Sequence, residues 1–260
     1  MPDKVRKPRL GIFSLTGCAG DQLQILNMED ELLALVARFI IVDFQEGSSY
    51  KEPGAIDVAL VEGTVSTEKD LKHLKEIRER TKVLIALGNC AIEGCIQTMR
   101  NGSTSLTERL KDVYGVEPEY YDALESKPLR EYVEVDLEIP GCPIEKDETL
   151  RAIVALLNGN QPQPFTYPVC VECKINEYPC LITEENKPCL GPLVRAGCNA
   201  RCPGLGLDCI GCRGLVEGSE NFAAEYQMLL DKGFSEEFIL NRLRVFSGEL
   251  PAGFIGGAEK

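Results

Sequence analysis

Basic charge, histidine and long apolar runs are scarce in this chain of 260 residues. It has 28 Lys and Arg residues against 41 Asp and Glu, which gives a formal net charge of −13 at pH 7. Because a nucleic-acid partner needs a basic surface, this balance argues against one and favours a face that docks on other proteins. No apolar run approaches the roughly 18 residues that span a bilayer, so we expect no membrane-embedded segment.

The amino-terminal residues do not have the pattern of a secretory signal. Only residues 10–15 separate the basic start from Thr16, which is too short for the apolar region of a signal peptide. We therefore expect a cytoplasmic protein. A reducing compartment disfavours a disulfide framework, so the 12 cysteines indicate ligation of a metal or of iron–sulfur clusters.

Strand-like and helix-like segments alternate along the first part of the chain. The expected strands are 9–14, 40–44, 55–61, 82–87 and 131–139, and the expected helices are 21–38, a segment that begins after Ser66 or Thr67, and 145–157. This alternation predicts a flavodoxin-like, doubly wound parallel sheet with helices on both faces. A proline-rich linker at 158–168 divides this α/β domain (1–160) from a smaller cysteine-rich iron–sulfur domain (161–260), in which we expect helices at about 219–232 and 235–246.

Three of the expected strands are followed by a cysteine. Cys18, Cys90 and Cys142 come after the first, fourth and fifth strands. The carboxyl ends of the strands of a doubly wound sheet meet at one edge and bind ligands there, so we expect these thiols to converge. Asp21, in the motif C-A-G-D, occupies the second position of a C-x-x-C spacing and is a candidate fourth ligand. The alternative is a carboxylate that the helix dipole stabilises.

Eight further cysteines lie in one stretch that is poor in bulky apolar side chains, so crosslinks must hold it together. Sequence separation divides them into two sets of four: Cys170, Cys173, Cys180 and Cys189, then Cys198, Cys202, Cys209 and Cys212. Each set contains a C-x-x-C pair, which places two thiolates on one tight turn. Zinc accepts the same thiolates, so a zinc-stabilised structural adaptor remains an alternative to an iron–sulfur protein.

The motifs T-G-C-A-G-D, G-N-C-A and P-G-C-P resemble the proximal-cluster signature of the small subunits of [NiFe]-hydrogenases. C-L-G-P-L-V-R-A-G-C followed by C-I-G-C resembles their medial and distal cluster region. The resemblance runs from about Leu10 to Gly214 and is closest to the cytoplasmic, multimeric branch, which includes coenzyme-F420-linked enzymes and archaeal sulfhydrogenases. A complex-I-type cluster subunit is a related alternative, but the eight additional cysteines argue against it.

This resemblance implies three [4Fe-4S] clusters. The proximal cluster would be held by Cys18, Asp21, Cys90 and Cys142, the medial cluster by Cys198, Cys202, Cys209 and Cys212, and the distal cluster by Cys170, Cys173, Cys180 and Cys189. The chain departs from the family pattern at Asp21, where a cysteine is usual, and at Cys170, where membrane-linked relatives use a histidine. The only histidine, His73, lies in a charged segment and is expected to be a solvated surface residue.

The resemblance also implies an electron relay in a heterotetramer without membrane attachment. Hydrogen would be split at a NiFe centre on a large subunit, and iron–sulfur and FAD-containing subunits would reduce NADP or polysulfide. This chain has no G-x-G-x-x-G and no P-loop to bind a nucleotide, and the three clusters would leave no thiolates for nickel. We expect the proximal edge to face the large subunit, with Glu62, Gly63 and Asn89 shaping that face.

Overall fold

The computed structural model describes residues 6–99, 101, 104–115, 122–218, 222–248 and 250. The chain forms two compact units, Met1–Lys146 and Asp147–Lys260, each with its own core. By this division helix α7 (Lys146–Leu157) belongs almost wholly to the cysteine-rich unit, whereas the sequence-based expectation groups it with the sheet.

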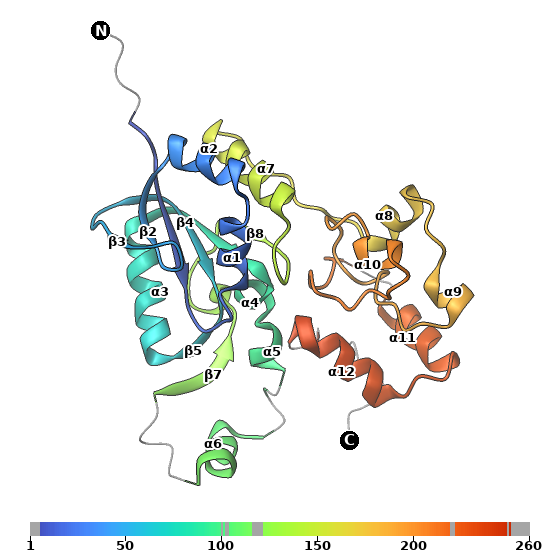
Figure 1. The fold of residues 1–260 in the computed structure, drawn as a ribbon. Helices are drawn as coiled ribbons and strands as arrows, with labels where there is room; N and C mark the ends of the chain where they lie inside the picture. The colour runs from blue at the N-terminus through green and yellow to red at the C-terminus, as the bar shows by residue number, and fades with distance from the viewer. Residues whose placement is uncertain are drawn as a thin grey trace. The chain divides into compact units, whose positions relative to one another are not determined.

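In the described part of the first unit, six strands form one sheet in the order β3-β2-β1-β4-β6-β8 (Figure 1). They are β1 (Arg9–Ser14), β2 (Ile40–Phe44), β3 (Ser48–Lys51), β4 (Ile56–Glu62), β6 (Thr81–Leu87) and β8 (Leu137–Ile139). Neighbouring strands are parallel except for β2 and β3. Without the antiparallel edge strand β3, the chain order across the sheet is 2-1-3-4-5, which confirms the flavodoxin-like topology.

Helices cover both faces of this sheet. α1 (Gly20–Leu26) and α2 (Asp30–Arg38) connect β1 to β2, and α3 (Glu68–Arg80) lies between β4 and β6. These two crossovers run in opposite directions across the sheet, so right-handed connections place their helices on opposite faces, as Figure 1 shows. The single helix expected over 21–38 was wrong, because a turn at residues 27–29, where Glu29 has φ 46°, separates α1 from α2.

The last strand is shorter than expected. β8 covers only Leu137–Ile139, and the 3-10 helix η2 (Leu129–Glu131) occupies the start of the expected strand 131–139. Asp136 explains why the pairing of β8 with β6 does not extend further toward the amino terminus of β8. The N–H of Asp136 donates to Leu84 O (2.9 Å), while its Oδ2 accepts from Leu84 N (2.7 Å). A side-chain oxygen thus replaces the next backbone acceptor of the ladder.

Short elements that the periodicity did not reveal surround the carboxyl edge of the sheet. β5 (Val65–Thr67) and β7 (Ala123–Lys127) form an antiparallel pair. After β6 come α4 (Gly88–Glu93), α5 (Cys95–Thr98) and α6 (Leu106–Tyr114). The elements α4 and α5 are too short for a helical period to be visible in the sequence.

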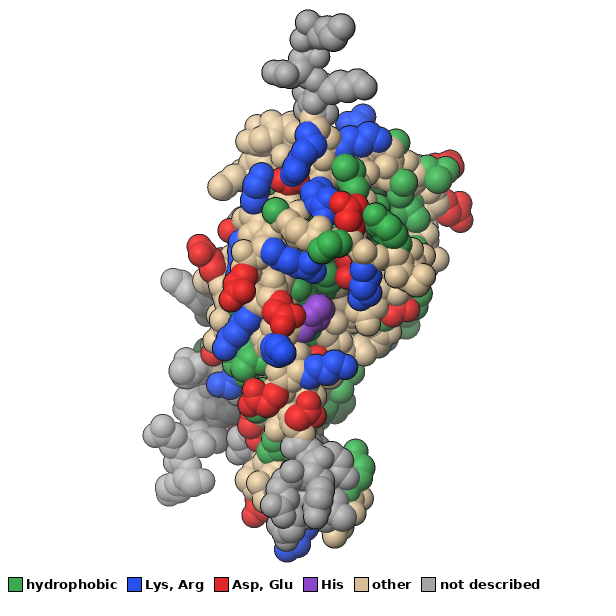
Figure 2. Space-filling view, turned by 90° about the vertical axis from the view of Figure 1, so that its left-hand side faces the viewer, with side chains coloured by type: hydrophobic (Ala, Val, Ile, Leu, Met, Phe, Trp, Pro, Cys, Tyr) green, Lys and Arg blue, Asp and Glu red, His purple; other side chains and the backbone are tan. Residues whose placement is uncertain are grey.

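Helix α3 buries Leu74 and Ile77 and presents charged side chains to solvent. Figure 2 shows this face, with Lys, Arg, Asp and Glu side chains around the histidine. His73 is only half-exposed, contrary to the expectation of a solvated residue, because its ring packs edge-on against Phe13 with centroids 5.9 Å apart. Burial lowers its pKa, which fits a packing role on the helix.

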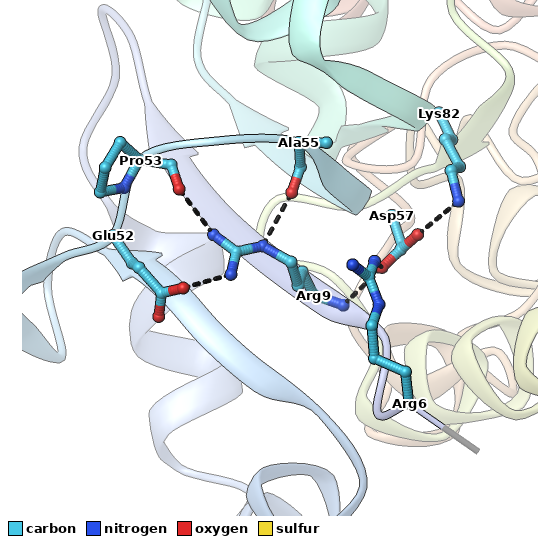
Figure 3. A network of polar contacts seen from close by, with 7 residues as sticks. All are labelled: Arg6, Arg9, Glu52, Pro53, Ala55, Asp57 and Lys82. Atoms are coloured by element: carbon cyan, nitrogen blue, oxygen red, sulfur yellow. Dashed lines mark hydrogen bonds and ion pairs between the residues drawn. The ribbon is translucent and has the colours of Figure 1, made fainter. Parts of the chain in front are cut away.

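The amino ends of β1 and β4 are joined by a polar network (Figure 3). The Arg9 guanidinium donates to Glu52, to Pro53 O (2.9 Å) and to Ala55 O (2.8 Å). Asp57 accepts from Arg9 N (2.9 Å) and from the side chains of Arg6 (2.8 Å) and Lys82 (2.7 Å). The network lies at the amino end of the strands, opposite the edge that carries the first set of candidate ligands.

The second unit contains short helices around a thiol-containing core. After α7 come α8 (Val169–Ile175), α9 (Leu181–Glu185), α10 (Arg201–Gly204), α11 (Phe222–Asp231) and α12 (Glu236–Ser247). Cys189 and Cys209 are themselves buried in this core with Leu190, Leu193 and Leu243. In the part of the chain that the structure describes, no helix is both long and apolar enough to cross a membrane.

Candidate metal centres

Backbone hydrogen bonds join the loops at the carboxyl edge of the sheet in pairs. Thr16, after β1, donates to Thr64 O (3.1 Å), and Thr64, after β4, donates back to Thr16 O (2.8 Å). Asn89 N donates to Gly141 O (2.7 Å), which joins the loop after β6 to the loop after β8. At the edge predicted to carry the proximal site, hydrogen bonds therefore join the loop after β1 to the loop after β4, and the loop after β6 to the loop after β8.

Three thiols lie in hydrogen-bond contact at this edge. Cys90 is in α4, Cys142 follows β8, and Cys95 is the first residue of α5. The hydrogen bonds from Cys95 lower the pKa of Cys142 to about 7 and also lower the pKa of Cys90. The same contacts raise the pKa of Cys95, which therefore acts as the proton donor of the group.

Sequence reasoning missed Cys95. It follows no expected strand and belongs to no C-x-x-C pair, so neither signal marked it. The one available sign was its position five residues after Cys90 in G-N-C-A-I-E-G-C. The turn at Gly94, with φ 85°, reverses the chain and returns Cys95 toward Cys90.

Asp21 is buried beside these thiols. Its pKa is raised to about 8, mainly by burial and to a smaller extent by Glu62, Cys142 and Cys90, while a hydrogen bond from Ile144 N to Oδ1 (2.9 Å) opposes the shift. The residue lies in the first turn of α1, where the helix dipole favours a carboxylate. Its acceptor bond nevertheless goes to the loop after β8, which places the carboxylate in the thiol group.

Cys18 is exposed, on the loop between β1 and α1, next to Ala19 with φ 60°. Glu62, at the end of β4, fixes the helix that follows this loop. Its carboxylate accepts from Gln22 N (3.0 Å) and from Ser14 Oγ (3.1 Å). The loop that carries Cys18 therefore leads into a helix that Glu62 anchors to the end of β4.

Glu62, Gly63 and Asn89 are the residues that we expect to shape the face toward the large subunit. All three are buried within this chain. Gly63 has φ 87°, and a Cβ on it would lie 2.8 Å from Thr16 O. These residues support the loops of the site from within, through contacts such as that of Gly63 with the backbone of Thr16.

In the second unit, the first cysteine set converges. Cys170 and Cys173 share one turn of α8, and Cys180 precedes α9. Burial, followed by smaller effects of Cys189, Cys173, Glu225 and Cys180, raises the pKa of Cys170 to about 12, so these cysteines lie near one another. A Cβ on Gly191 would lie 3.2 Å from Cys170 Sγ and 3.5 Å from Cys189 Sγ, so the loop passes close to both.

The second set adjoins the first. Burial, followed by smaller effects of Cys189, Cys212 and Cys198, raises the pKa of Cys209 well above its ordinary value. The backbone N–H of Cys209 donates to Cys189 Sγ at 3.2 Å. Cys202 lies on α10, four residues after Cys198. The residues around Cys189 and Cys209 therefore connect the two sets directly.

Glu172, between the two cysteines of C-V-E-C, is a further structural residue that sequence reasoning missed. Its buried carboxylate accepts from Gly197 N (2.8 Å) and Ala200 N (3.1 Å). It thereby fixes the loop that carries Cys198, whose thiol lies 4.0 Å from Glu172 Oε2. No pattern in the sequence identifies backbone N–H partners 25 and 28 residues away.

The donors present fit iron–sulfur ligation. Thiolates are the ligands that iron–sulfur clusters use, and both units provide grouped thiols rather than scattered ones. Among the described residues, no group of three or more His, Cys, Asp or Glu is arranged to hold a single metal ion. The match between these residues and iron–sulfur clusters therefore rests on the thiol chemistry of the donors and on their grouping.

Residues 18–156 match the family described as NADH ubiquinone oxidoreductase, 20 Kd subunit. The chain is also 42% identical to sulfhydrogenase 2 subunit delta of Pyrococcus furiosus, over 92% of this chain and 99% of that protein. The chain belongs to this family, among its hydrogenase small subunits. It is 36% identical to a vhu subunit of the F420-non-reducing hydrogenase of Methanocaldococcus jannaschii, over 83% of this chain and 85% of the relative.

Solved structures agree with this family assignment. A chain of an NAD+-reducing [NiFe]-hydrogenase in the H2-reduced state matches with 30% identity and a TM-score of 0.55, covering 61% of this chain and 95% of that chain. A chain of the NiFeSe hydrogenase from Desulfomicrobium baculatum matches over 83% of this chain and 97% of its own length, with 18% identity and a TM-score of 0.54. The second match shows a shared fold.

Proposed function

We propose that this chain is the electron-transfer small subunit of a [NiFe]-hydrogenase of the sulfhydrogenase type. The observation that carries the proposal is the grouping of thiols in both units of a chain whose relatives over most of its length are hydrogenase subunits. The match to the first relative includes the cysteine-rich unit, which lies largely outside the matched 20 kDa family region. This extent favours a hydrogenase subunit over a complex-I-type subunit with one cluster.

Three [4Fe-4S] clusters are part of the proposal. The proximal cluster would be held by Cys18, Asp21, Cys90 and Cys142, the medial cluster by Cys198, Cys202, Cys209 and Cys212, and the distal cluster by Cys170, Cys173, Cys180 and Cys189. Such clusters accept and release single electrons. The chain itself would orient their ligands through residues such as Glu62 and Glu172, and would exclude water from the buried thiols.

The expected partners supply the chemistry that the motifs of this chain do not. A large subunit would carry the NiFe centre, and further iron–sulfur and FAD subunits would deliver electrons to NADP or polysulfide. Electrons would enter at the proximal cluster and leave at the distal one. A cytoplasmic location belongs to the same proposal, because a reducing compartment keeps 12 cysteines available as ligands.

Metal analysis of anaerobically purified protein tests the proposal. We expect about twelve iron and twelve acid-labile sulfide atoms per chain, as three four-iron clusters require. Two or three zinc ions per chain without sulfide would contradict the electron relay and support the structural adaptor instead.

The variant Asp21→Cys tests the carboxylate ligand. Because iron in these clusters prefers a thiolate to a carboxylate, iron content should remain near the wild-type value while the redox or electron paramagnetic resonance (EPR) signature of one cluster shifts. An unaltered spectrum would show that Asp21 does not bind the cluster.

A further inference from the structure

Two cysteines that belong to different proposed clusters are joined by a hydrogen bond. The backbone N–H of Cys209 donates to Cys189 Sγ (3.2 Å), and Leu190 N donates back to Cys209 O (3.0 Å). Cys189 is 7% exposed and Cys209 is 6% exposed, and a hydrogen bond in such a buried place is stronger than one in water. Hydrogen bonds to the sulfurs are one of the factors that set the potential of an iron–sulfur cluster, so this contact acts on the cluster that Cys189 would bind.

Helix α12 holds the Cys209 side of this contact. The guanidinium of Arg242, in α12, pairs with the Asp208 carboxylate, and its Nη2 also donates to Cys209 O (3.5 Å). The ring of Phe238, one turn earlier in the helix, lies against the same guanidinium, with 5.9 Å between the ring centroid and Cζ. The N–H of Cys209 belongs to the peptide group between Asp208 and Cys209. One guanidinium therefore contacts both residues that this peptide group joins.

We propose that Arg242 and Asp208 are positioning residues that hold the Cys209 N–H against Cys189 Sγ and thereby raise the reduction potential of the cluster that Cys189 binds. The inference rests on the proposed function, because it needs clusters in the second unit. Reduction adds one electron, and with it negative charge, to the cluster and its thiolates. A hydrogen-bond donor at a thiolate sulfur stabilises that charge, so the reduced form is favoured while the donor is held in place.

A direct effect of charge is the alternative explanation, and the ion pair itself separates the two. Removing the Arg242 guanidinium takes away a positive charge, which alone would lower the potentials of nearby clusters. Removing the Asp208 carboxylate takes away a negative charge, which alone would raise them. Loss of positioning lowers the potential of the same cluster in both variants, because either change releases the peptide group between Asp208 and Cys209.

Redox titration of the complete complex, monitored by EPR, tests this proposal. Wild type, Arg242→Met, Asp208→Ala and the double variant are purified anaerobically with their partner subunits. Each single variant should shift the reduction equilibrium of one cluster about tenfold toward the oxidised form, which is about 59 mV for one electron. The double variant should show no larger shift, because both residues act on the same peptide group. The coupling of that cluster to an exchangeable proton, which pulsed EPR detects in normal water and not in heavy water, should weaken in all three variants.

Further variants assign the signal and provide the matched control. Cys189→Ser identifies the cluster, because an oxygen ligand in place of sulfur alters the spectrum of the cluster that it binds. Arg244→Met removes the same charge two residues further along α12, on a different side of the helix, and should leave every potential unchanged. An equal shift there would contradict the role of Arg242. Iron content and circular dichroism verify folding, and Asp208→Ala, at a loop residue that is 25% exposed, keeps the proposal testable if Arg242→Met does not fold.

Two other results would overturn the proposal. If Asp208→Ala raises the potential that Arg242→Met lowers, charge alone accounts for both shifts. If both variants keep the wild-type potential and proton coupling, the pair does not hold the Cys209 N–H in place. Absence of iron and sulfide from the wild type would instead refute the proposed function, so the two failures are distinguishable.

Discussion

The carboxylate of Asp21 lies directly against the backbone of Gly88, so that a Cβ added to Gly88 would overlap Asp21 Oδ2. Gly88 follows β6 and is the first residue of α4, the helix that carries Cys90. Its φ of 77° also belongs to the region that glycine adopts without strain. Gly88, which follows β6, thus leaves the space that the carboxylate of Asp21, which follows β1, occupies.

Gly88→Ala should displace Asp21 and disturb the proximal site. We expect a loss of about 2 kcal/mol in the free energy of unfolding, together with an altered EPR signal or lost iron. Gly115→Ala is the control, since Gly115 has φ 66° but nothing within 4 Å of its would-be Cβ. That variant should cost only the backbone strain, about 1 kcal/mol, and leave the iron unchanged. Equal effects of the two variants would contradict the role assigned to the Asp21 contact.

The sheet could be predicted because its signals are local. Buried strands separated by amphipathic helices define a doubly wound topology, and the ends of those strands marked Cys18, Cys90 and Cys142. The remaining features depend on contacts between distant residues. Asp136, whose side chain bonds to Leu84 N, sets where β8 begins, and hydrophobic periodicity does not reveal such a contact.

The site was only partly predictable for the same reason. Asp21 could be proposed as a ligand because it stands at the second cysteine position of a C-x-x-C spacing. Cys95 reaches the same thiols only through the turn at Gly94, and Glu172 acts on backbone groups of a later loop. His73 resembled a solvated residue because the contact with Phe13 is visible only in three dimensions.

Glu172→Ala should destabilise the loop that carries Cys198. The substitution leaves the N–H groups of Gly197 and Ala200 without their charged acceptor, so we expect a loss of about 2 kcal/mol. Glu172→Gln should have a smaller effect because one acceptor oxygen remains. Thermal unfolding and iron content measure both variants. Lys174→Ala, an exposed change on the same helix, should have little effect, and a comparable loss there would refute the specific role of Glu172.

The Asp57 network predicts an acid-dependent contribution to stability. Burial alone would raise the pKa of Asp57, but hydrogen bonds from Lys82, Arg9 and Arg6 outweigh it and lower the pKa to about 2. Because the folded pKa lies below the unfolded value of about 3.9, the contribution is complete above that value and is lost as pH falls toward 2.

Asp57→Asn should therefore lower the thermal midpoint by the same amount at pH 7 and pH 5. Peptide-resolved hydrogen exchange should show faster exchange at Arg9, whose N–H bonds to Asp57 Oδ2. Lys82→Met removes one of the three donors and should have a smaller effect. A difference between Asp57→Asn and wild type that disappears already between pH 7 and pH 5 would contradict a lowered pKa.

Arg213→Met should be the most damaging single change in the second unit. Arg213 is 1% exposed, its Nε donates to Ala196 O (2.8 Å), and its Nη2 pairs with Glu148 Oε2 at 2.5 Å. Removing the guanidinium takes the ion-pair partner away from the largely buried Glu148, with only the more distant charges of Arg151 and Arg195 remaining, and we expect a cost of about 3 kcal/mol. Adding Glu148→Gln removes the carboxylate that has lost its ion-pair partner, so the double variant should recover part of that loss in thermal unfolding.

The pH dependence of Arg213→Met distinguishes a charge effect from a packing effect. Burial already raises the pKa of Glu148, and Arg213 opposes that shift. Without Arg213 the pKa rises further above the unfolded value of about 4.3, so the penalty is largest at high pH and decreases as pH falls and Glu148 binds a proton. The stability difference from wild type should thus be smaller at pH 5.5 than at pH 8. A penalty that is equal at both values, and that Glu148→Gln does not relieve, would assign the effect of Arg213 to its packing alone.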